Sequence, residues 1–223
     1  MTVRLILCCA LLAAVSVSAQ EDYNAIFEQA VNAVDFEFGD SWAYTETQVN
    51  GEGTWIGRFD PRHPSDERWQ LLSVDGRGPT EEELEEYLKG KNHDRSGDGD
   101  KRVNAMVEPD SVRLIEDAAD YWLFGFNPDE EEIMDGVDAT IRIDKDSGQL
   151  EYIDLRNHET FRPAIGVKIS KLITRLTFGP AAEGGPIVPL ATQVEVKGRA
   201  YLVVSFDEQE ILRNSDFVYA GGE

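Results

Sequence analysis

Strict alternation of apolar and polar residues over positions 137–144 is the feature that most constrains the fold of this chain. A period of two is typical of a strand with one buried and one solvated face. Lys145-Asp146-Ser147-Gly148 then forms a predicted turn, and Leu150 to Leu155 returns as a second strand. Residues 136–178 are therefore predicted to form consecutive antiparallel strands, with a bulge near Ser170 where the apolar parity changes.

Two longer helices are predicted outside this segment. Asp22 to Val34 has an apolar stripe that should pack on the sheet, formed by Tyr23, Phe27, Ala30, Val31 and Val34. Thr80 and Glu83 form a capping box that opens a second, acidic helix. Asn127-Pro128 is typical of the start of a short helix that would run through Met134.

Further strands are indicated by β-favouring runs between turn residues. They cover Trp42 to Val49, Thr54 to Asp60, Arg68 to Val74, Val112 to Glu116 and Tyr121 to Phe126. Near the end, Val194 to Val196 and Ala200 to Phe206 are predicted to form a hairpin around Lys197-Gly198. The second of these strands is apolar at successive positions, so we expect it to be covered on both sides. Leu212 to Tyr219 is predicted as a separate last strand.

The first residues are typical of a secretory signal rather than of a folded element. Arg4 precedes an apolar run, and Val17-Ser18-Ala19 fits a small-residue cleavage site, so Met1 to Ala19 is expected to be removed. Residues 20–223 then form one predicted domain, periplasmic or secreted. Both cysteines, Cys8 and Cys9, lie in the signal. No later segment reaches the ~20 apolar residues of a membrane-spanning helix.

The charge balance excludes some partners. The chain carries 43 acidic and 21 basic residues, for a net charge of −22. Such a surface repels phosphate backbones and anionic head groups, so neither nucleic acid nor direct membrane docking is expected. The simplest interpretation is that the charge keeps a secreted monomer soluble.

A series of features follows in order over roughly residues 22–76: the N-terminal helix, Asn50-Gly51 with Gly53, Pro61 and Pro64, Arg68-Trp69 and Asp75-Gly76. In this order they resemble the opening of the periplasmic lipoprotein-carrier (LolA-like) family. The resemblance implies a strongly curved antiparallel sheet closed by helices over an apolar cavity that receives acyl chains. The chain departs from the family at Pro79-Thr80, where an acidic helix and a loop are inserted over about residues 79–104.

Motifs for metal binding and catalysis are incomplete. Asp94, Ser96, Asp98 and Asp100 have the spacing of a calcium loop, but Ala105 stands where a closing glutamate is required. A plain acidic loop is therefore predicted, with calcium binding as the alternative. The three histidines, His63, His93 and His158, are far apart in the sequence, and no phosphate loop, dinucleotide fingerprint or nucleophile elbow is present. We predict no catalytic residue, no metal and no cofactor.

Aromatic residues cluster on the predicted strands and are the candidate ligand-binding residues. Each of three sets shares one strand parity and so one face: Trp42 with Tyr44, Trp55 with Phe59, and Trp122 with Phe124 and Phe126. One interpretation is an ordinary well-filled core. The other is that a sheet with few covering helices leaves an apolar cavity or a partner-binding patch.

These patterns together predict an α+β fold, with a single strongly curved antiparallel half-barrel sheet and a few helices over one face. The predicted function is a non-catalytic periplasmic carrier or binding protein for an acyl-chain or lipidated ligand. One alternative is a structural or interaction module of the cell envelope, with an envelope protein as its partner. A second is a hydrolase that uses an acidic pair.

Overall fold

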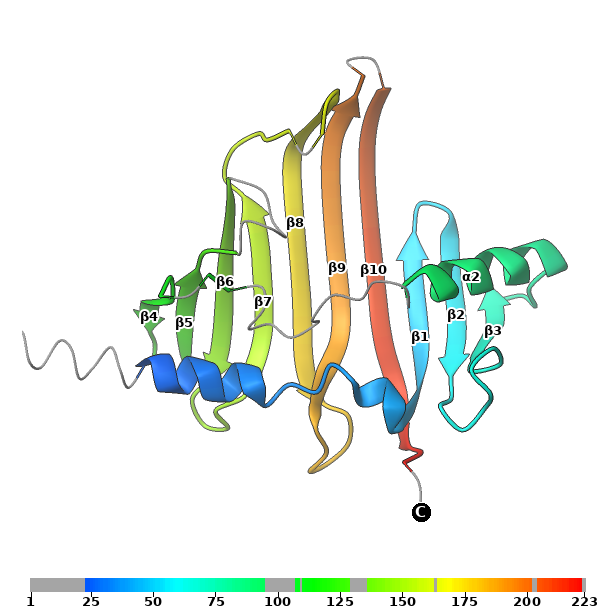
Figure 1. The fold of residues 1–223 in the computed structure, drawn as a ribbon, viewed down its shortest axis with the longest axis horizontal. Helices are drawn as coiled ribbons and strands as arrows, with labels where there is room; N and C mark the ends of the chain where they lie inside the picture. The colour runs from blue at the N-terminus through cyan, green and yellow to red at the C-terminus, as the bar shows by residue number, and fades with distance from the viewer. Residues whose placement is uncertain are drawn as a thin grey trace, which may run out of the picture.

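The computed structural model describes residues 23–94, 107–108, 110–128, 136–162, 164–201 and 204–221. In this part of the chain, ten strands form one open antiparallel sheet in the order β3-β2-β1-β10-β9-β8-β7-β6-β5-β4 (Figure 1). The strands are β1 (Trp42–Asn50), β2 (Gly53–Phe59), β3 (Trp69–Val74), β4 (Arg113–Asp117), β5 (Tyr121–Phe126), β6 (Val137–Asp144), β7 (Leu150–Asn157), β8 (Val167–Pro180), β9 (Ile187–Ala200) and β10 (Val204–Tyr219). The predicted antiparallel sheet with few helices is confirmed.

The central alternation forms the predicted strand. The four apolar members of β6 are buried, at 8% exposure or less: Val137, Ala139, Ile141 and Ile143. Gly148 closes the turn to β7 with φ 69°, and its N–H donates to the Asp144 carbonyl at 2.9 Å. The register of β8 against β9 shifts between Ile169 and Lys171, which confirms the predicted bulge near Ser170.

The prediction for β9 and β10 is wrong. No turn forms at Lys197-Gly198: β9 continues to Ala200, and Gly198 pairs with both Ile169 and Phe206. A Cβ at Gly198 would lie 2.5 Å from both the Lys168 carbonyl oxygen and the Phe206 ring. Gly198 therefore marks a close approach between strands rather than a reversal of the chain.

The final strand also differs from its prediction. β10 is one strand of 16 residues, so the predicted separate strand from Leu212 is its second half. Its start is not covered on both sides, because Val204 is 57% exposed. Successive apolar residues at a strand end do not by themselves require burial, since much of a protein surface is apolar.

The two helices match their predictions closely. Residues 23–32 are helical and bury Phe27, Ala30 and Val31 against the apolar residues of β5, β6 and β7. Helix α2 (Glu81–Asp94) begins with the predicted capping box, in which the Thr80 N–H donates to Glu83 Oε2 at 2.8 Å. A short 3-10 helix, η1 (Phe38–Asp40), precedes β1. Neither described helix is long and apolar enough to cross a membrane.

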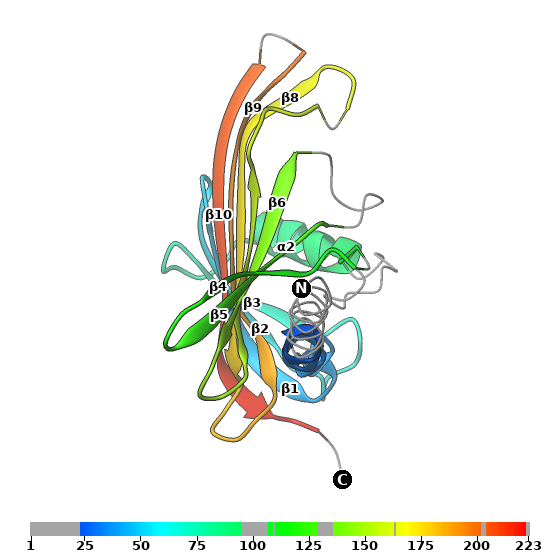
Figure 2. The ribbon, with the colours of Figure 1, turned by 90° about the vertical axis from the view of Figure 1, so that its left-hand side faces the viewer.

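Both helices lie on the same face of the sheet. Directly paired residues share a face, and the pairs form one continuous row across all ten strands: Leu114, Phe124, Ile141, Ile153, Leu176, Thr192, Leu212, Gln48, Trp55 and Val74. The N-terminal helix packs over the Phe124 end of this row, and α2 packs over the Val74 end. Figure 2 shows both helices on one side of the bent sheet.

Several predicted segments lie outside the described residues. These are the signal (1–19), the calcium-like loop after Asp94, and residues 129–135 of the predicted short helix. Pro128, the predicted first residue of that helix, forms an antiparallel bridge with Val107 instead.

Candidate functional site

Among four of the hollows formed by described residues, the largest has a volume of about 740 Å³. It lies at the upper end of β8, β9 and β10 in Figure 1, where these strands extend beyond their neighbours. We call it the upper hollow, and it is lined by Arg162, Gly166, Val167, Lys168, Ser170, Lys197, Gly198, Arg199, Ser205, Phe206 and Asp207. The other three hollows have volumes of about 410, 390 and 200 Å³.

The apolar part of the upper hollow comes from Val167 and Phe206, both half-buried. Gly198 is the direct cross-strand partner of Phe206. Because Gly198 has no side chain, the Phe206 ring lies across the β9 backbone, in the space that a Cβ would occupy. The missing side chain at Gly198 thus allows the Phe206 ring to line the upper hollow.

The polar part of the upper hollow is mainly cationic. Lys168 is paired across the strands with Arg199, and Arg199 with Ser205. Lys197 is neutralised by two carboxylates, with Nζ–O distances of 3.0 Å to Asp207 and 3.5 Å to Glu195. The hydrogen bond to Asp207, helped by both carboxylate charges, raises the pKa of Lys197. Because neighbouring residues of a strand point to opposite faces, these polar side chains lie on the other face of the sheet from Val167 and Phe206.

The predicted aromatic residues belong to three separate clusters of the core. Phe124 and Phe126 are fully buried beneath the N-terminal helix, and Trp122 packs against them. Tyr44 and Phe59 form a second cluster with Phe38, and Trp42 packs against it. Trp55 packs against a third cluster beneath α2. The structure thus brings Tyr44 and Phe59 into ring contact at 5.3 Å, but it does not bring Trp42, Trp55 and Trp122 together.

Of these seven aromatics, only Trp55 lines any of the four hollows. That hollow is the smallest, at about 200 Å³, and Tyr87 and Lys91 of α2 form its other side. The sequence reasoning missed the residues of the upper hollow. Phe206 and the basic residues of β8 and β9 are visible in the sequence. The turn predicted at Lys197-Gly198 gave no reason to expect them in neighbouring positions of one sheet.

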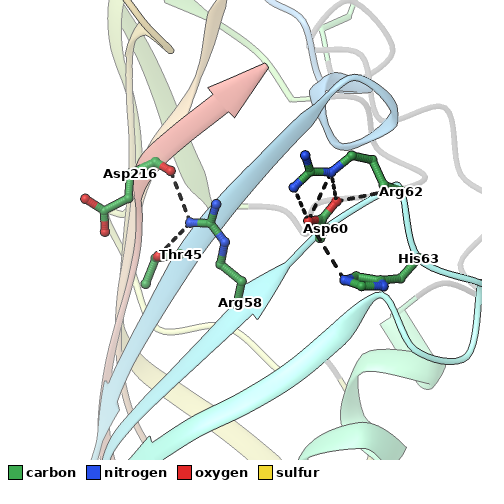
Figure 3. Close-up of polar contacts among 6 residues, drawn as sticks. All are labelled: Thr45, Arg58, Asp60, Arg62, His63 and Asp216. Carbon is green, nitrogen blue, oxygen red and sulfur yellow. Dashed lines mark hydrogen bonds and ion pairs between the residues drawn. The ribbon is translucent and has the colours of Figure 1, made fainter. Parts of the chain in front are cut away.

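Each buried carboxylate in the described part of the chain is paired with a cation. Glu46 pairs with Lys91, Asp60 with Arg62, and Asp154 with Arg175 and Arg156. Figure 3 shows the Arg62 guanidinium against Asp60, with Nη2 2.6 Å from Oδ2 and His63 Nε2 4.0 Å from the same oxygen.

These pairings lower the pKa values of two of the carboxylates. Hydrogen bonding from the Arg62 side chain is the main cause that brings the pKa of Asp60 down to about 2. Burial alone would raise the pKa of Asp154, but hydrogen bonds and charge from Arg175 and Arg156 outweigh it and lower the pKa. A general acid needs a raised pKa instead, so neither carboxylate suits that role in an acidic-pair hydrolase.

Metal ligands do not gather among the residues that the structure describes. No group of three or more His, Cys, Asp or Glu side chains there is placed to hold an ion. His158 Nδ1 lies 3.2 Å from Asp138 Oδ2, and both side chains are exposed. This contact is an ordinary surface pair.

Comparison with known proteins found no matching family model, no curated protein similar in sequence and no similar solved structure. The resemblance to lipoprotein carriers therefore stays a prediction from the sequence. The function must be argued from the geometry of the chain itself.

Proposed function

We propose that this protein is a non-catalytic carrier or binding protein for an acyl-chain or lipidated ligand, acting in the periplasm or outside the cell. The observation that carries the proposal is the upper hollow, whose volume of about 740 Å³ is combined with the apolar surfaces of Val167 and Phe206. Small-molecule sites typically enclose ~300 to 1,000 Å³ and join apolar walls to a few polar groups.

The proposal moves the ligand away from the aromatic clusters. Phe124 and Phe126 are at most 2% exposed, so they fill the core beneath the N-terminal helix and offer little surface to a ligand. An acyl chain at Phe206 instead removes apolar surface from water at ~25 cal/mol per Å². That gain has to exceed the loss of translational and rotational freedom on binding. The half-barrel arrangement of the lipoprotein-carrier family is part of this proposal.

The first test measures acyl binding to the delipidated full chain. Palmitate, kept below its micellar concentration, should displace a fluorescent acyl probe saturably. Phe206→Ala should weaken palmitate binding about tenfold, since roughly 1.4 kcal/mol of apolar contact is lost. Tyr219→Ala is the matched control: this aromatic lies at the other end of β10, is 63% exposed and should be replaceable without effect.

Tryptophan emission distinguishes the upper hollow from the aromatic clusters. None of the four tryptophans lines the upper hollow, so their emission should change little when palmitate binds. A large saturable blue shift that is lost in Trp122→Phe would place the ligand in the aromatic core instead. If the folded, delipidated protein binds no palmitate and the native preparation yields no extractable lipid, the carrier proposal is wrong. The interaction module of the cell envelope would then be favoured.

A further inference from the structure

We propose that the free edge of β10 over residues 204–210 receives a basic, extended segment of a partner protein as an additional antiparallel strand. We call these residues the open edge. They belong to the part of β10 that continues past the turn between β1 and β2 (Figure 1). The inference goes beyond the proposed carrier function and does not depend on it.

The open edge has a neighbouring strand on one side only. The pairing of β1 with β10 ends at Val49 and Ile211, whereas the pairing of β9 with β10 continues to Ala200 and Val204. Within the described part of the chain, residues 204–210 therefore pair with β9 alone. Every second residue of an antiparallel strand directs its N–H and C=O away from a given neighbour. The open edge thus presents a row of backbone donors and acceptors to which a strand can be added.

The opposite edge of the same strands is covered. Phe161 and Ile169 of β8 exchange two backbone hydrogen bonds, of 3.1 and 2.9 Å. The side chain of Asn157 accepts from the Leu172 N–H at 2.6 Å and donates to the Ser170 carbonyl at 3.3 Å. The connection between β7 and β8 thus occupies the free side of β8, and no described segment does the same for β10.

The two end strands of the sheet are less suited to strand addition. β3 has six residues and β4 has five, and each has a register shift against its neighbour. Short length and bulges protect a sheet edge from pairing. The pairing of β9 with β10 runs from Val204 to Arg213 without a shift, and the open edge contains neither Pro nor Lys. It is therefore a regular edge.

The charge beside the open edge selects the kind of partner. A hollow of about 390 Å³ extends along it to the turn between β1 and β2. Four carboxylates line this hollow, and its described lining contains no basic side chain; the carboxylates belong to Glu52, Asp207, Glu208 and Glu210. Opposite charges at cross-strand positions stabilise a sheet, so lysine or arginine in an added strand is favoured.

The register specifies which side chains an added strand would meet on each face. Phe206, Glu208 and Glu210 share the helix-covered face with Leu212, whereas Asp207 lies on the other face and pairs with Lys197 there. On the helix-covered face, the added strand would thus place an apolar residue beside Phe206 and a basic residue beside Glu208. Backbone hydrogen bonds provide affinity in this mode of recognition, and the alternating side chains provide specificity.

A second copy of this chain fits the open edge poorly. Antiparallel pairing of two open edges would bring the carboxylates of Asp207, Glu208 and Glu210 close to the same groups of the other copy. Like charges at opposing positions destabilise a sheet, and each copy carries a net charge of −22. The same carboxylates thus reject a second copy and attract a basic segment.

The experiment uses end-blocked peptides of the same length as the open edge. The delipidated full chain is titrated with a fluorescent peptide in which lysine alternates with valine, and saturable binding is expected. A glutamate–valine peptide of the same length should bind at least tenfold more weakly, because its charge is repelled. Sodium chloride should weaken the binding of the lysine peptide, because salt screens exposed charges.

N-methylated peptides separate strand pairing from simple charge attraction. Two versions of the lysine peptide carry N-methyl groups either on every lysine or on every valine, and both keep the full charge. Only one row of N–H groups faces β10 in an added strand. One version should therefore bind like the parent peptide, and the other at least tenfold more weakly, because several hydrogen bonds are lost. Hydrogen exchange should slow at alternate residues of the open edge when the parent peptide binds.

A matched pair of variants tests the carboxylates. Glu208→Gln should weaken binding of the lysine peptide about threefold, the effect of one cross-strand charge pair. Glu85→Gln is the control, because this exposed carboxylate of α2 lies outside the hollow along the open edge and should leave binding unchanged. Thermal melts check that both variants are folded.

Each adverse outcome overturns a different part of the inference. Equal binding of the parent peptide and both N-methylated versions would mean attraction to an acidic surface without strand pairing. Equal binding of the glutamate and lysine peptides would remove the assignment to a basic partner. A dimer of the chain alone, with slow exchange at the same residues of the open edge, would identify a second copy as the occupant. The carrier function is tested separately with palmitate, so none of these outcomes decides it.

Discussion

Asp60 is the residue whose charge state is most clearly set by its neighbours. Its side chain accepts hydrogen bonds from the backbone N–H and the guanidinium of Arg62, and its pKa falls from 3.8 to about 2. A depressed folded-state pKa contributes stability above the ordinary pKa, and this contribution is lost as the pH falls from about 4 towards 2. Asp60→Asn should therefore cost about 1 kcal/mol at pH 6, since the Arg62 side chain is 59% exposed and solvent weakens the pair, and almost nothing near pH 2.

Urea unfolding at pH 6, 4 and 2.5 measures this dependence. Asp66→Asn, at an exposed position in the same connection between β2 and β3, is the control for removing one carboxylate charge from this segment. A stability difference for Asp60→Asn that stays constant across this pH range would contradict the assigned pairing.

Asp216 has a backbone conformation that most side chains disfavour. Its φ is 51°, at a register shift in the pairing of β1 with β10 between Ala43 and Thr45. Arg58 Nη1 donates to the Asp216 carbonyl at 3.2 Å and to Thr45 Oγ1 at 3.1 Å, as Figure 3 shows. Asp216→Gly should keep or slightly increase stability, whereas Asp216→Val should lose about 1 to 2 kcal/mol in urea unfolding, because a β-branched residue is strained at positive φ. Equal stability of the two variants would refute this account.

At the scale of elements, α2 is held on the sheet by a contact between an aromatic ring and a glycine. Tyr87 is buried, and its Oη would lie 1.9 Å from a Cβ at Gly57. Gly57→Ala should therefore displace Tyr87 and lower the free energy of unfolding by roughly 1 to 3 kcal/mol. Gly51→Ala is the control, because nothing lies within 4 Å of its Cβ. In a double-mutant cycle with Tyr87→Ala the two losses should be less than additive, and simple additivity would show that the contact does not hold the helix.

At the scale of the whole molecule, strand length and strand order decide where a ligand can bind. β8, β9 and β10 have 14, 14 and 16 residues, against nine or fewer in each of the other strands. Their excess length forms the upper end in Figure 1, away from the core clusters. The pairing of β1 with β10 joins the first strand to the last and attaches β1, β2 and β3, with α2, to the rest of the sheet. The aromatic residues of β1 and β5 are consequently separated by five intervening strands in the sheet order.

The sequence by itself determined most of the elements of this fold. Alternation predicted β6, the turn before Leu150 predicted the hairpin with β7, and the change of parity predicted the bulge at Ser170. The capping box at Thr80 likewise predicted the start of α2. These features were predictable because each depends on residues that are only a few positions apart in the sequence.

Only the tertiary structure decided which distant residues meet. Gly198 was predicted as a turn, yet it is a strand residue, because the Phe206 ring and the Lys168 carbonyl approach it from two other strands. The same pairing places Lys168 opposite Arg199, and it assigns the aromatic sets to separate clusters. Register between strands depends on long-range packing summed over many residues, and no local pattern in this chain specifies it.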